Sequence, residues 1–282
     1  MDTEVTAMYC ITDDWLKARR HQESLQCEVT DAEVMTVALA AARFFEGNFE
    51  KAWRHLTEGR YMLRRLSRGQ FNRRLHRISH LFQELLFQEL FERLAQHWKQ
   101  ASEEGVYLID SFPIPVCDNI RIDQCQIYPI SATKEAFRGY TASKRRFFYG
   151  LKMHVLTNAE GQPVEAFLTP GSRSDTGQLR HFEFDLPEGS TVYCDKAYNE
   201  YFTEDTLTDA CKINLSPIRK KNSTRPDSAS VRYLQAVYRK RIETTFSQID
   251  RLMPESIHAI TAKGFELKVF LFVLAFSFDG LF

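Results

Sequence analysis

The chain has 282 residues, of which 44% are hydrophobic and 26% are charged, and its 37 basic side chains are balanced by 37 acidic ones. These fractions are ordinary for a globular protein, and the length suits one large domain or two smaller ones. The net charge of zero argues neither for nor against a nucleic-acid partner, so any sign of one has to be sought in local clusters of charge.

The cysteines and the apolar segments exclude several classes of protein. Six cysteines are scattered without a Cys-x-x-Cys pair, which argues against a zinc site and a disulfide framework and fits a reducing cytoplasm. Met1–Arg20 lacks the apolar stretch of a signal peptide. Val269–Phe278 is apolar but far shorter than the roughly 20 residues of a membrane-spanning helix. We therefore expect a buried helix there, in a cytoplasmic protein without a membrane partner.

Helix signals dominate the first part of the chain. Thr30 and Glu33 have the spacing of a capping box, as do Ser67 and Gln70, and Asn48 is a further capping residue. Apolar side chains follow each of these positions at helical spacing. The sequence therefore predicts a series of short amphipathic helices.

Two segments concentrate basic side chains, Lys51–His80 and Arg219–Arg241. Such clusters attract polyanions, although a solvated helix face is the alternative interpretation of each. One helix of the first segment presents Arg73, Arg74 and Arg77, and short helices followed by an arginine-rich one are typical of a helix-turn-helix unit. We therefore expect this helix to bind DNA.

The pattern changes from helical to extended around Lys99–Gly105. We place a domain boundary there. It divides the chain into a helical N-terminal domain, residues 1–100, and a second domain, residues 101–282.

An apolar strand, Val106–Ile109, opens the second domain and delivers Asp110 at its carboxyl end. Pro113 and Pro115 follow and are predicted to end regular strand pairing. A second compact apolar strand ends in the same way at Asp195. Buried strands that each deliver one carboxylate are a common way of placing acids at a reaction centre.

The remaining elements of the second domain follow from the pattern of apolar residues. Strands are predicted at Arg146–Thr157, Pro163–Leu168, Thr191–Cys194 and Ile213–Leu215, helices at Gly177–Phe184, Glu200–Ala210, Val231–Leu252 and Gly264–Phe278, and a loop at Tyr128–Tyr140. This order matches a ribonuclease H-like fold, an α/β mixed sheet with flanking helices, here preceded by an all-α domain. In that fold the first and fourth strands are parallel neighbours, so the two aspartates at the strand ends are predicted to lie side by side.

A third acid, Glu243, lies at the edge of the apolar stripe of a long helix. The stripe comprises Ile242, Phe246, Ile249 and Met253. The alternative to a functional role for Glu243 is a structural one, an ion pair with Arg239 one helical turn earlier. Such a pair contributes only about 0.3–0.5 kcal/mol, which does not explain an acid beside a buried face.

Three carboxylates at one place repel one another and raise one another's pKa. Divalent cations remove this penalty, and Mg²⁺ or Mn²⁺ is suited to carboxylate oxygens. Two ions roughly 3.5–4 Å apart can activate a water or a 3′-hydroxyl and stabilise the leaving oxygen of a phosphodiester. We therefore expect Asp110, Asp195 and Glu243 to bind two ions and to be catalytic.

Basic side chains near these acids are expected to hold the phosphates of DNA. They are Lys144, Arg145, Arg146, Lys196, Arg219, Lys220, Lys221, Arg239 and Arg241.

Other polar and aromatic residues have structural interpretations. Asp175 is predicted to cap a helix, with tuning of the metal site as the alternative. His154 is predicted to be a core histidine with a hydrogen-bond partner. Phe147, Phe148 and Tyr149 are predicted to be core residues, with base stacking as the alternative.

At these positions the sequence resembles bacterial insertion-sequence transposases of the DDE type, and within them the insertion sequence 982 family. The resemblance rests on four segments, IDSFPIPVC with Asp110, FYGLKMHVLTN, YCDKAY with Asp195, and RKRIETTFSQID with Glu243. It covers most of residues 104–282. It implies a metal-dependent enzyme that cuts DNA at the ends of its element and joins the freed 3′ ends to target DNA. It also implies that the two aspartates bind metal and that the glutamate completes the site.

One departure concerns the helix that carries Glu243. Some insertion-sequence families have a Tyr, Arg, Glu, Lys signature there. Tyr238, Arg241 and Glu243 are present, but their spacing differs and no lysine follows within two turns, where Arg251 is the nearest basic residue. The contacts to terminal bases that this signature implies are therefore not transferred.

The expected partner is double-stranded DNA, as the terminal inverted repeats of the element and as the target. Because two ends have to be held together, we expect a homodimer or a larger assembly on DNA. A ribonuclease H-like nuclease without strand transfer and a DNA-binding protein that no longer cuts are the alternatives. The three intact acids argue against the second of these.

Overall fold

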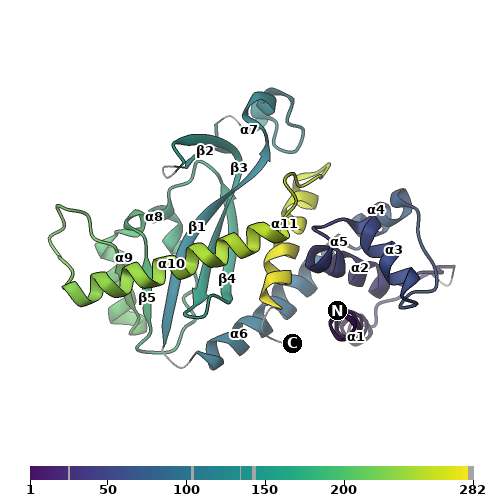
Figure 1. The fold of residues 1–282 in the computed structure, drawn as a ribbon, viewed down its shortest axis with the longest axis horizontal. Helices are drawn as coiled ribbons and strands as arrows, with labels where there is room; N and C mark the ends of the chain where they lie inside the picture. The colour runs from purple at the N-terminus through teal and green to yellow at the C-terminus, as the bar shows by residue number, and fades with distance from the viewer. Residues whose placement is uncertain (25, 103–104, 134, 142–143, 279–282) are drawn as a thin grey trace. The chain divides into compact units, whose positions relative to one another are not determined.

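The computed structural model describes residues 1–24, 26–102, 105–133, 135–141 and 144–278, and it has the predicted mixed α/β architecture (Figure 1). Its residues cluster into two compact units. The first, called the helical unit, comprises Met1–Arg93 and Ile249–Phe282. The second, called the sheet unit, comprises Leu94–Gln248.

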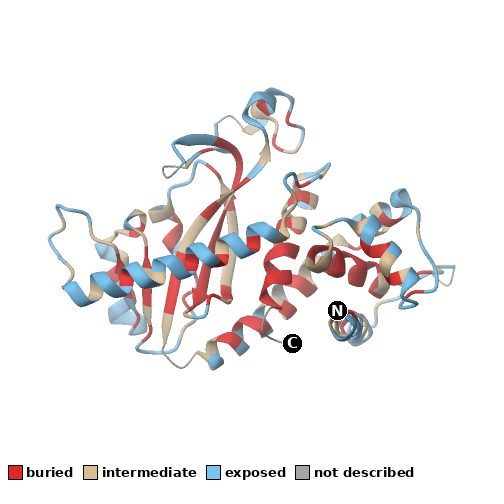
Figure 2. Ribbon diagram, viewed as in Figure 1, coloured by how far each residue is buried: buried red, intermediate tan, exposed pale blue. Residues whose placement is uncertain are grey.

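The helical unit is built around one buried helix, α2. Its helices are α1 (Asp2–Ala18), α2 (Asp31–Phe44), α3 (Phe49–Glu58), α4 (Arg68–Arg77), α5 (Ser79–Glu84), the π-helical turn η1 (Leu85–Phe91) and α11 (Ala262–Ser277). Helix α2 packs against α1, α3, α4 and α11, and nearly all of its side chains are buried (Figure 2). The core of this unit therefore surrounds α2.

The helix starts predicted from the sequence are confirmed. Thr30 and Glu33 form a reciprocal capping box at the start of α2, and Ser67 and Gln70 form another at α4. Asn48 accepts a hydrogen bond from the backbone of α3 at 3.0 Å. Because each cap satisfies backbone N–H groups that the helix itself cannot pair, these sites fix where the helices begin.

The apolar helix α11 differs from the others in being apolar on nearly all sides. Ten of its residues are buried, as expected for a helix that is hydrophobic all round. The sequence assigned this segment to the second domain, whereas the structure groups it with the N-terminal helices because α11 packs against α2. Within the part of the chain that the structure describes, no helix is both long and apolar enough to cross a membrane.

The sheet unit contains a mixed sheet of six strands among its described residues. The strands are β1 (Val106–Cys117), β2 (Arg138–Thr141), β3 (Arg146–Asn158), β4 (Pro163–Pro170), β5 (Thr191–Cys194) and β6 (Asn214–Pro217). The helices are α6 (Glu92–Ala101), η2 (Asn119–Gln124), α7 (Ile130–Thr133), α8 (Asp175–Gln178), η3 (Leu179–His181), η4 (Lys196–Tyr198), α9 (Tyr201–Thr206), η5 (Leu207–Cys211) and α10 (Ala229–Leu252), the last of which ends in the helical unit.

The strand order is β2-β3-β1-β5-β6, and β4 also pairs with β3. β1 runs antiparallel to β3 and parallel to β5, and β5 runs parallel to β6. The sheet is thus the mixed sheet of the predicted ribonuclease H-like fold. The segment predicted as a loop at Tyr128–Tyr140 instead contains α7 and the start of β2, whose four residues are too few for a clear alternating pattern.

β1 is longer than predicted, and the prediction that pairing stops after Asp110 is wrong. β1 pairs with β3 as far as Cys117, including the registers of Pro113 with Lys152 and Pro115 with Gly150. The parallel partner β5, however, pairs only as far as Ile109. Proline is tolerated in a strand where its missing N–H faces an edge without a partner strand, which explains how β1 continues.

Helix α10 lies along one face of the sheet (Figure 1). The Tyr238 ring stacks on Tyr193 of β5 with centroids 5.0 Å apart, and Phe246 contacts Phe112 of β1 at 4.6 Å. The Thr245 hydroxyl donates to the carbonyl of Gly161 at 3.2 Å. These contacts fix the helix over β1 and β5.

Gly150→Ala is expected to destabilise the sheet by about 3 kcal/mol or more. A Cβ at Gly150 would lie 2.2 Å from the carbonyl oxygen of Ile114 and 2.8 Å from the amide nitrogen of Val116, both backbone atoms of β1. Urea unfolding followed by circular dichroism measures the loss. Gly69→Ala in α4 is the control, because its Cβ would meet only Arg73 at 3.7 Å. Equal midpoints for the two variants would contradict the prediction.

Candidate active site

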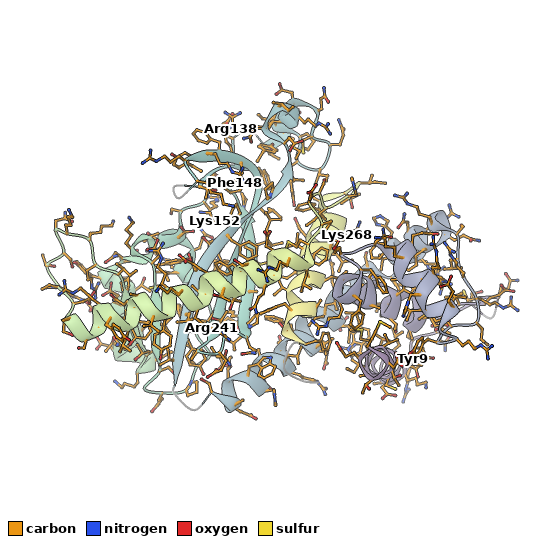
Figure 3. All side chains as sticks on the ribbon, viewed as in Figure 1. Tyr9, Arg138, Phe148, Lys152, Arg241 and Lys268 are labelled. Atoms are coloured by element: carbon orange, nitrogen blue, oxygen red, sulfur yellow. The ribbon has the colours of Figure 1, made fainter. Side chains whose placement is uncertain are left out.

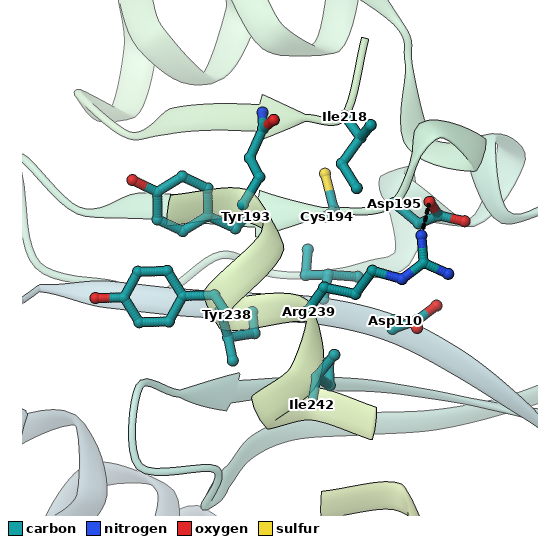
Figure 4. Close-up of a pocket in the computed structure, with 11 residues that line it drawn as sticks. Asp110, Tyr193, Cys194, Asp195, Ile218, Tyr238, Arg239 and Ile242 are labelled. Carbon is teal, nitrogen blue, oxygen red and sulfur yellow. Dashed lines mark hydrogen bonds and ion pairs between the residues drawn. The ribbon is translucent and has the colours of Figure 1, made fainter. Parts of the chain in front are cut away.

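Asp110 and Asp195 come from neighbouring parallel strands, at the point where the parallel pairing of β1 with β5 ends. The register pairs Ile109 of β1 with Cys194 of β5, so Asp110 and Asp195 are the next residue of each strand. Both line a pocket that is closed on one side by Arg239 and other residues of α10 (Figure 4). The parallel pairing therefore brings together two acids that are 85 positions apart in the sequence (195 − 110).

Asp110 lies in an environment that opposes its charge. Burial, together with the smaller effects of the Asp195 and Asp175 charges, raises the pKa of its carboxyl from 3.8 to about 7. The backbone N–H of Ser111, which donates to Asp110 at 2.8 Å, and the guanidinium of Arg239 act in the opposite direction. The site therefore favours additional positive charge beside Asp110.

Arg239 of α10 joins the other two acids. Its Nη1 lies 3.2 Å from Asp195 Oδ1 (Figure 4). Its Nε lies 3.0 Å from Glu243 Oε1. The predicted ion pair along the helix is thus present. The side chain of Glu243 is 57% exposed and does not line the pocket, so it reaches the site through Arg239. The guanidinium of Arg239 therefore links Asp195 to Glu243 and lines the same pocket as Asp110.

Asp175 is a fourth acid near the site, and the prediction that it caps a helix is wrong. Ser174 is the capping residue of α8, and Asp175 is the first helical residue. Asp175 Oδ1 accepts hydrogen bonds from the Ser111 hydroxyl at 2.9 Å and from Lys152 Nζ at 3.0 Å. Sequence reasoning missed Ser111 and Lys152 because only the register of β1 with β3 brings them together.

The carboxylates fit a divalent cation. Carboxylate oxygens are the ligands that Mg²⁺ and Mn²⁺ prefer, and the two aspartates converge in one pocket. Burial and the neighbouring acids raise the pKa of Asp110, so a cation beside its carboxylate would stabilise the charged form. Asp110, Asp195 and Glu243 could therefore hold a metal, with Arg239 supplying a positive charge at the same place.

A second group of possible ligands lies in the helical unit. One ligand atom each of His21, Glu23 and Asp31 lies within 4.8 Å of the others. Arg74, however, already donates to Asp31 at 2.5 and 2.9 Å and lies 3.6 Å from Glu23. This cluster is accordingly an ion-pair network, and Arg74, predicted to contact DNA, is half-buried within it.

The other basic residues predicted to contact DNA divide into exposed and internally paired ones. The exposed ones are Arg73, Arg77, Lys144, Arg145, Arg146, Lys196, Lys220 and Lys221. Arg219 pairs with the buried Glu204 through two contacts of 2.7 and 2.8 Å. Arg241 is exposed and donates to the carbonyl of Glu160 (Figure 3). Arg74 and Arg219 therefore have structural partners that the charge pattern did not reveal.

The predicted core residues of β3 are confirmed with one exception. His154 is buried, with its Nε2 3.0 Å from the Thr169 hydroxyl, and Phe148 and Tyr149 are buried as well. Phe147 is 57% exposed, so the prediction that it is a core residue is wrong. Alternation along the strand turns its side chain away from the face that carries Phe148.

Comparison with known proteins gives two matches. A family model described as a transposase DDE domain matches residues 100–258, more than half of the chain. The transposase for insertion sequence element IS1106 of Neisseria meningitidis serogroup B is 30% identical over 107 residues, which are 36% of each protein. The chain thus spans about a third of the length of this curated relative. No solved structure matches.

Proposed function

Because the chain belongs to the transposase DDE domain family, we propose that it cuts DNA at the ends of a mobile element and joins the freed 3′ ends to target DNA. The observation that carries this proposal is the placement of Asp110 and Asp195. They come directly after the last parallel pair of β1 and β5 and line one pocket with Arg239. That is an arrangement suited to phosphodiester chemistry.

Each acid has a separate role in the proposal. Asp110 and Asp195 would hold two divalent ions, either Mg²⁺ or Mn²⁺. Glu243 would complete the set of ligands. When bound, these ions activate a water or a 3′-hydroxyl and stabilise the leaving oxygen. The backbone N–H of Ser111 orients the Asp110 carboxylate, and the Arg239 guanidinium attracts a phosphate to the pocket.

Double-stranded DNA is the proposed partner, both as the inverted repeats of the element and as the target. The exposed basic residues at the start of β3 and after β5, including Arg146 and Lys196, supply sequence-independent attraction for phosphates. Strand transfer requires two ends to be held together, so we propose a homodimer or a larger assembly on DNA. The name of the curated relative, a transposase for an insertion sequence element, supports DNA as the partner.

Metal-dependent nicking of supercoiled plasmid tests the acidic site. The wild-type protein is expected to nick with Mg²⁺ or Mn²⁺, and Asp195→Asn is expected to abolish nicking because asparagine keeps the shape but removes the charged ligand. Asp185→Asn is the matched control, since that side chain is 83% exposed and pairs with Lys99. Equal nicking by wild type and Asp195→Asn would refute the site.

The products separate the proposed transposase from a nuclease that uses the same acids. Plasmid or oligonucleotide substrates that carry the ends of the element are expected to yield joined strands, in which a donor 3′ end is linked to target DNA. Metal-dependent nicks without joined products would favour the nuclease. Both reactions are expected to require Asp195. The comparison of products therefore tests which reaction the protein catalyses, and it does not test where the active site lies.

A further inference from the structure

We propose that Tyr140 and Phe147, an exposed aromatic pair on neighbouring strands β2 and β3, form a surface on which the bases of an unpaired DNA strand stack. This inference rests on the proposed action on DNA and concerns a part of the sheet unit away from the acids. Neither residue belongs to the pocket that contains Asp110 and Asp195.

The two rings are unusually exposed for aromatic side chains in a sheet. Tyr140 is 52% exposed and Phe147 is 57% exposed, whereas Phe148 and Tyr149, next along β3, are buried. Tyr140 and Phe147 are directly opposite each other in the antiparallel register, and their ring centroids lie 5.0 Å apart. They therefore form one contiguous aromatic patch.

The strands below the patch are firmly held. Gly139 lies opposite Phe148, and a Cβ at Gly139 would lie 2.3 Å from that ring, so the ring fills the space that the glycine leaves. The Tyr149 hydroxyl donates to the carbonyl of Tyr128 at 2.8 Å. Asn119 donates its side-chain N–H to the carbonyl of Phe147, also at 2.8 Å. The patch is therefore pre-organised, which lowers the entropic cost of binding to it.

The charge around the patch identifies the partner. Between Phe137 and Tyr149 the sequence has four basic residues, Arg138, Lys144, Arg145 and Arg146, and no acidic one. All four are exposed, and Arg138 pairs with Glu135 at 3.0 Å. Exposed aromatic rings within a basic surface are the arrangement by which proteins bind single-stranded nucleic acid, with bases on the rings and phosphates on the cations.

An unpaired strand fits this surface better than a duplex does. In a duplex the faces of the bases are already stacked on one another, so only the phosphates and the groove edges are open to the protein. A strand that is opened at a cleaved end exposes base faces. A reaction that cuts and rejoins DNA produces such ends, which links the patch to the proposed function.

Binding of labelled DNA in the absence of divalent ions tests the inference on the full chain. Fluorescence anisotropy is measured with a fluorescein-labelled oligothymidylate and with a labelled duplex of the same length. Phe147→Ala is expected to weaken binding of the oligothymidylate by about tenfold or more, because it removes one stacking ring. Duplex binding is expected to change less than about threefold, because phosphate contacts dominate it. Phe147→Trp, which keeps an aromatic ring, is expected to retain wild-type affinity.

Phe202→Ala is the matched control, because Phe202 is 74% exposed on α9 in the same unit. It is expected to bind both DNA forms as the wild type does. The inference is overturned if Phe147→Ala leaves oligothymidylate binding unchanged, or if it weakens both forms equally. It is also overturned if light scattering shows that Phe147→Ala dissociates a dimer of this chain, which would make the patch a protein contact. The binding assay does not depend on cleavage. Its result would therefore remain valid even if the wild type and Asp195→Asn nicked plasmid equally.

Discussion

Asp110→Asn is expected to abolish metal-dependent cleavage and, in the same protein without metal, to raise the free energy of unfolding. The loss of activity should be roughly a thousandfold or more, since metal-assisted charge stabilisation contributes several kcal/mol to the transition state. The gain in stability follows from the position of the carboxyl group, which is buried beside two other acids. One substitution should therefore move activity and stability in opposite directions.

The sign of the stability effect depends on pH. The pKa of Asp110 is about 7 in the folded protein and 3.8 when unperturbed, so the folded state binds this proton more tightly than the unfolded state does. Stability therefore falls as the pH rises from about 4 through 7, by at most about 4 kcal/mol. Asparagine carries no charge, so the variant should be the more stable one at pH 8 and should lose this advantage at pH 4.

Urea unfolding with a chelator at pH 4 and pH 8 measures this difference. Asp118→Asn is the control, because the side chain of Asp118 is 76% exposed and lies 4.0 Å from Arg121. That variant should change the free energy of unfolding by less than about 0.5 kcal/mol at either pH. A wild-type protein that is as stable as Asp110→Asn at pH 8 would show that neither burial nor the neighbouring acids penalise the charged form of Asp110.

Periodicity and short-range motifs were sufficient to predict much of the fold. The capping boxes at Thr30 and Ser67 act within one turn of helix, so the sequence carries the whole signal. The neighbouring positions of Asp110 and Asp195 followed from the order of the strands, because a ribonuclease H-like sheet makes the two strands parallel neighbours. The resemblance to DDE-type insertion-sequence transposases is confirmed by the family match. The narrower resemblance to the insertion sequence 982 family stays a prediction.

Side-chain partners that are distant in sequence could not be predicted in this way. Arg74 is part of a basic run, yet its partner Asp31 lies 43 residues earlier on another helix. Lys152 and Ser111 meet at Asp175 because β1 continues past Asp110 and pairs with β3, with Ser111 opposite His154 and Pro113 opposite Lys152. A run of basic residues can be seen in the sequence, but the acidic partner of each residue depends on how the helices and strands pack.

The prolines of β1 and the aromatic residues of β3 were misjudged for a related reason. Pro113 and Pro115 interrupt a strand only if both of its edges need hydrogen bonds, and β5 pairs no farther than Ile109. The three consecutive aromatic residues that begin with Phe147 suggest a core strand by composition. Their burial is decided by what lies on each face, and Phe148 alone has the space left by Gly139.

Arg219 shows how far the structural and DNA-binding interpretations of a basic residue differ. It lies in a basic run with Lys220 and Lys221, but its guanidinium holds Glu204, whose side chain is 6% exposed, through two contacts of 2.7 and 2.8 Å. The contact with Glu204 raises the pKa of Arg219, which keeps the pair charged. The neighbouring lysines are exposed, so the same run contains matched controls.

Arg219→Met is expected to lower the free energy of unfolding by about 3 kcal/mol, because it removes both short contacts to the buried Glu204 and leaves only the more distant Arg225, at 3.8 Å. Lys220→Met and Lys221→Met should each change stability by less than about 0.5 kcal/mol, and each should reduce the salt dependence of DNA binding by about one phosphate contact. Urea unfolding and DNA binding at several salt concentrations separate these effects. Adding Glu204→Gln to Arg219→Met should restore part of the lost stability, because the buried charge is then gone. A stable Arg219→Met protein with weakened DNA binding would instead assign Arg219 to the DNA surface.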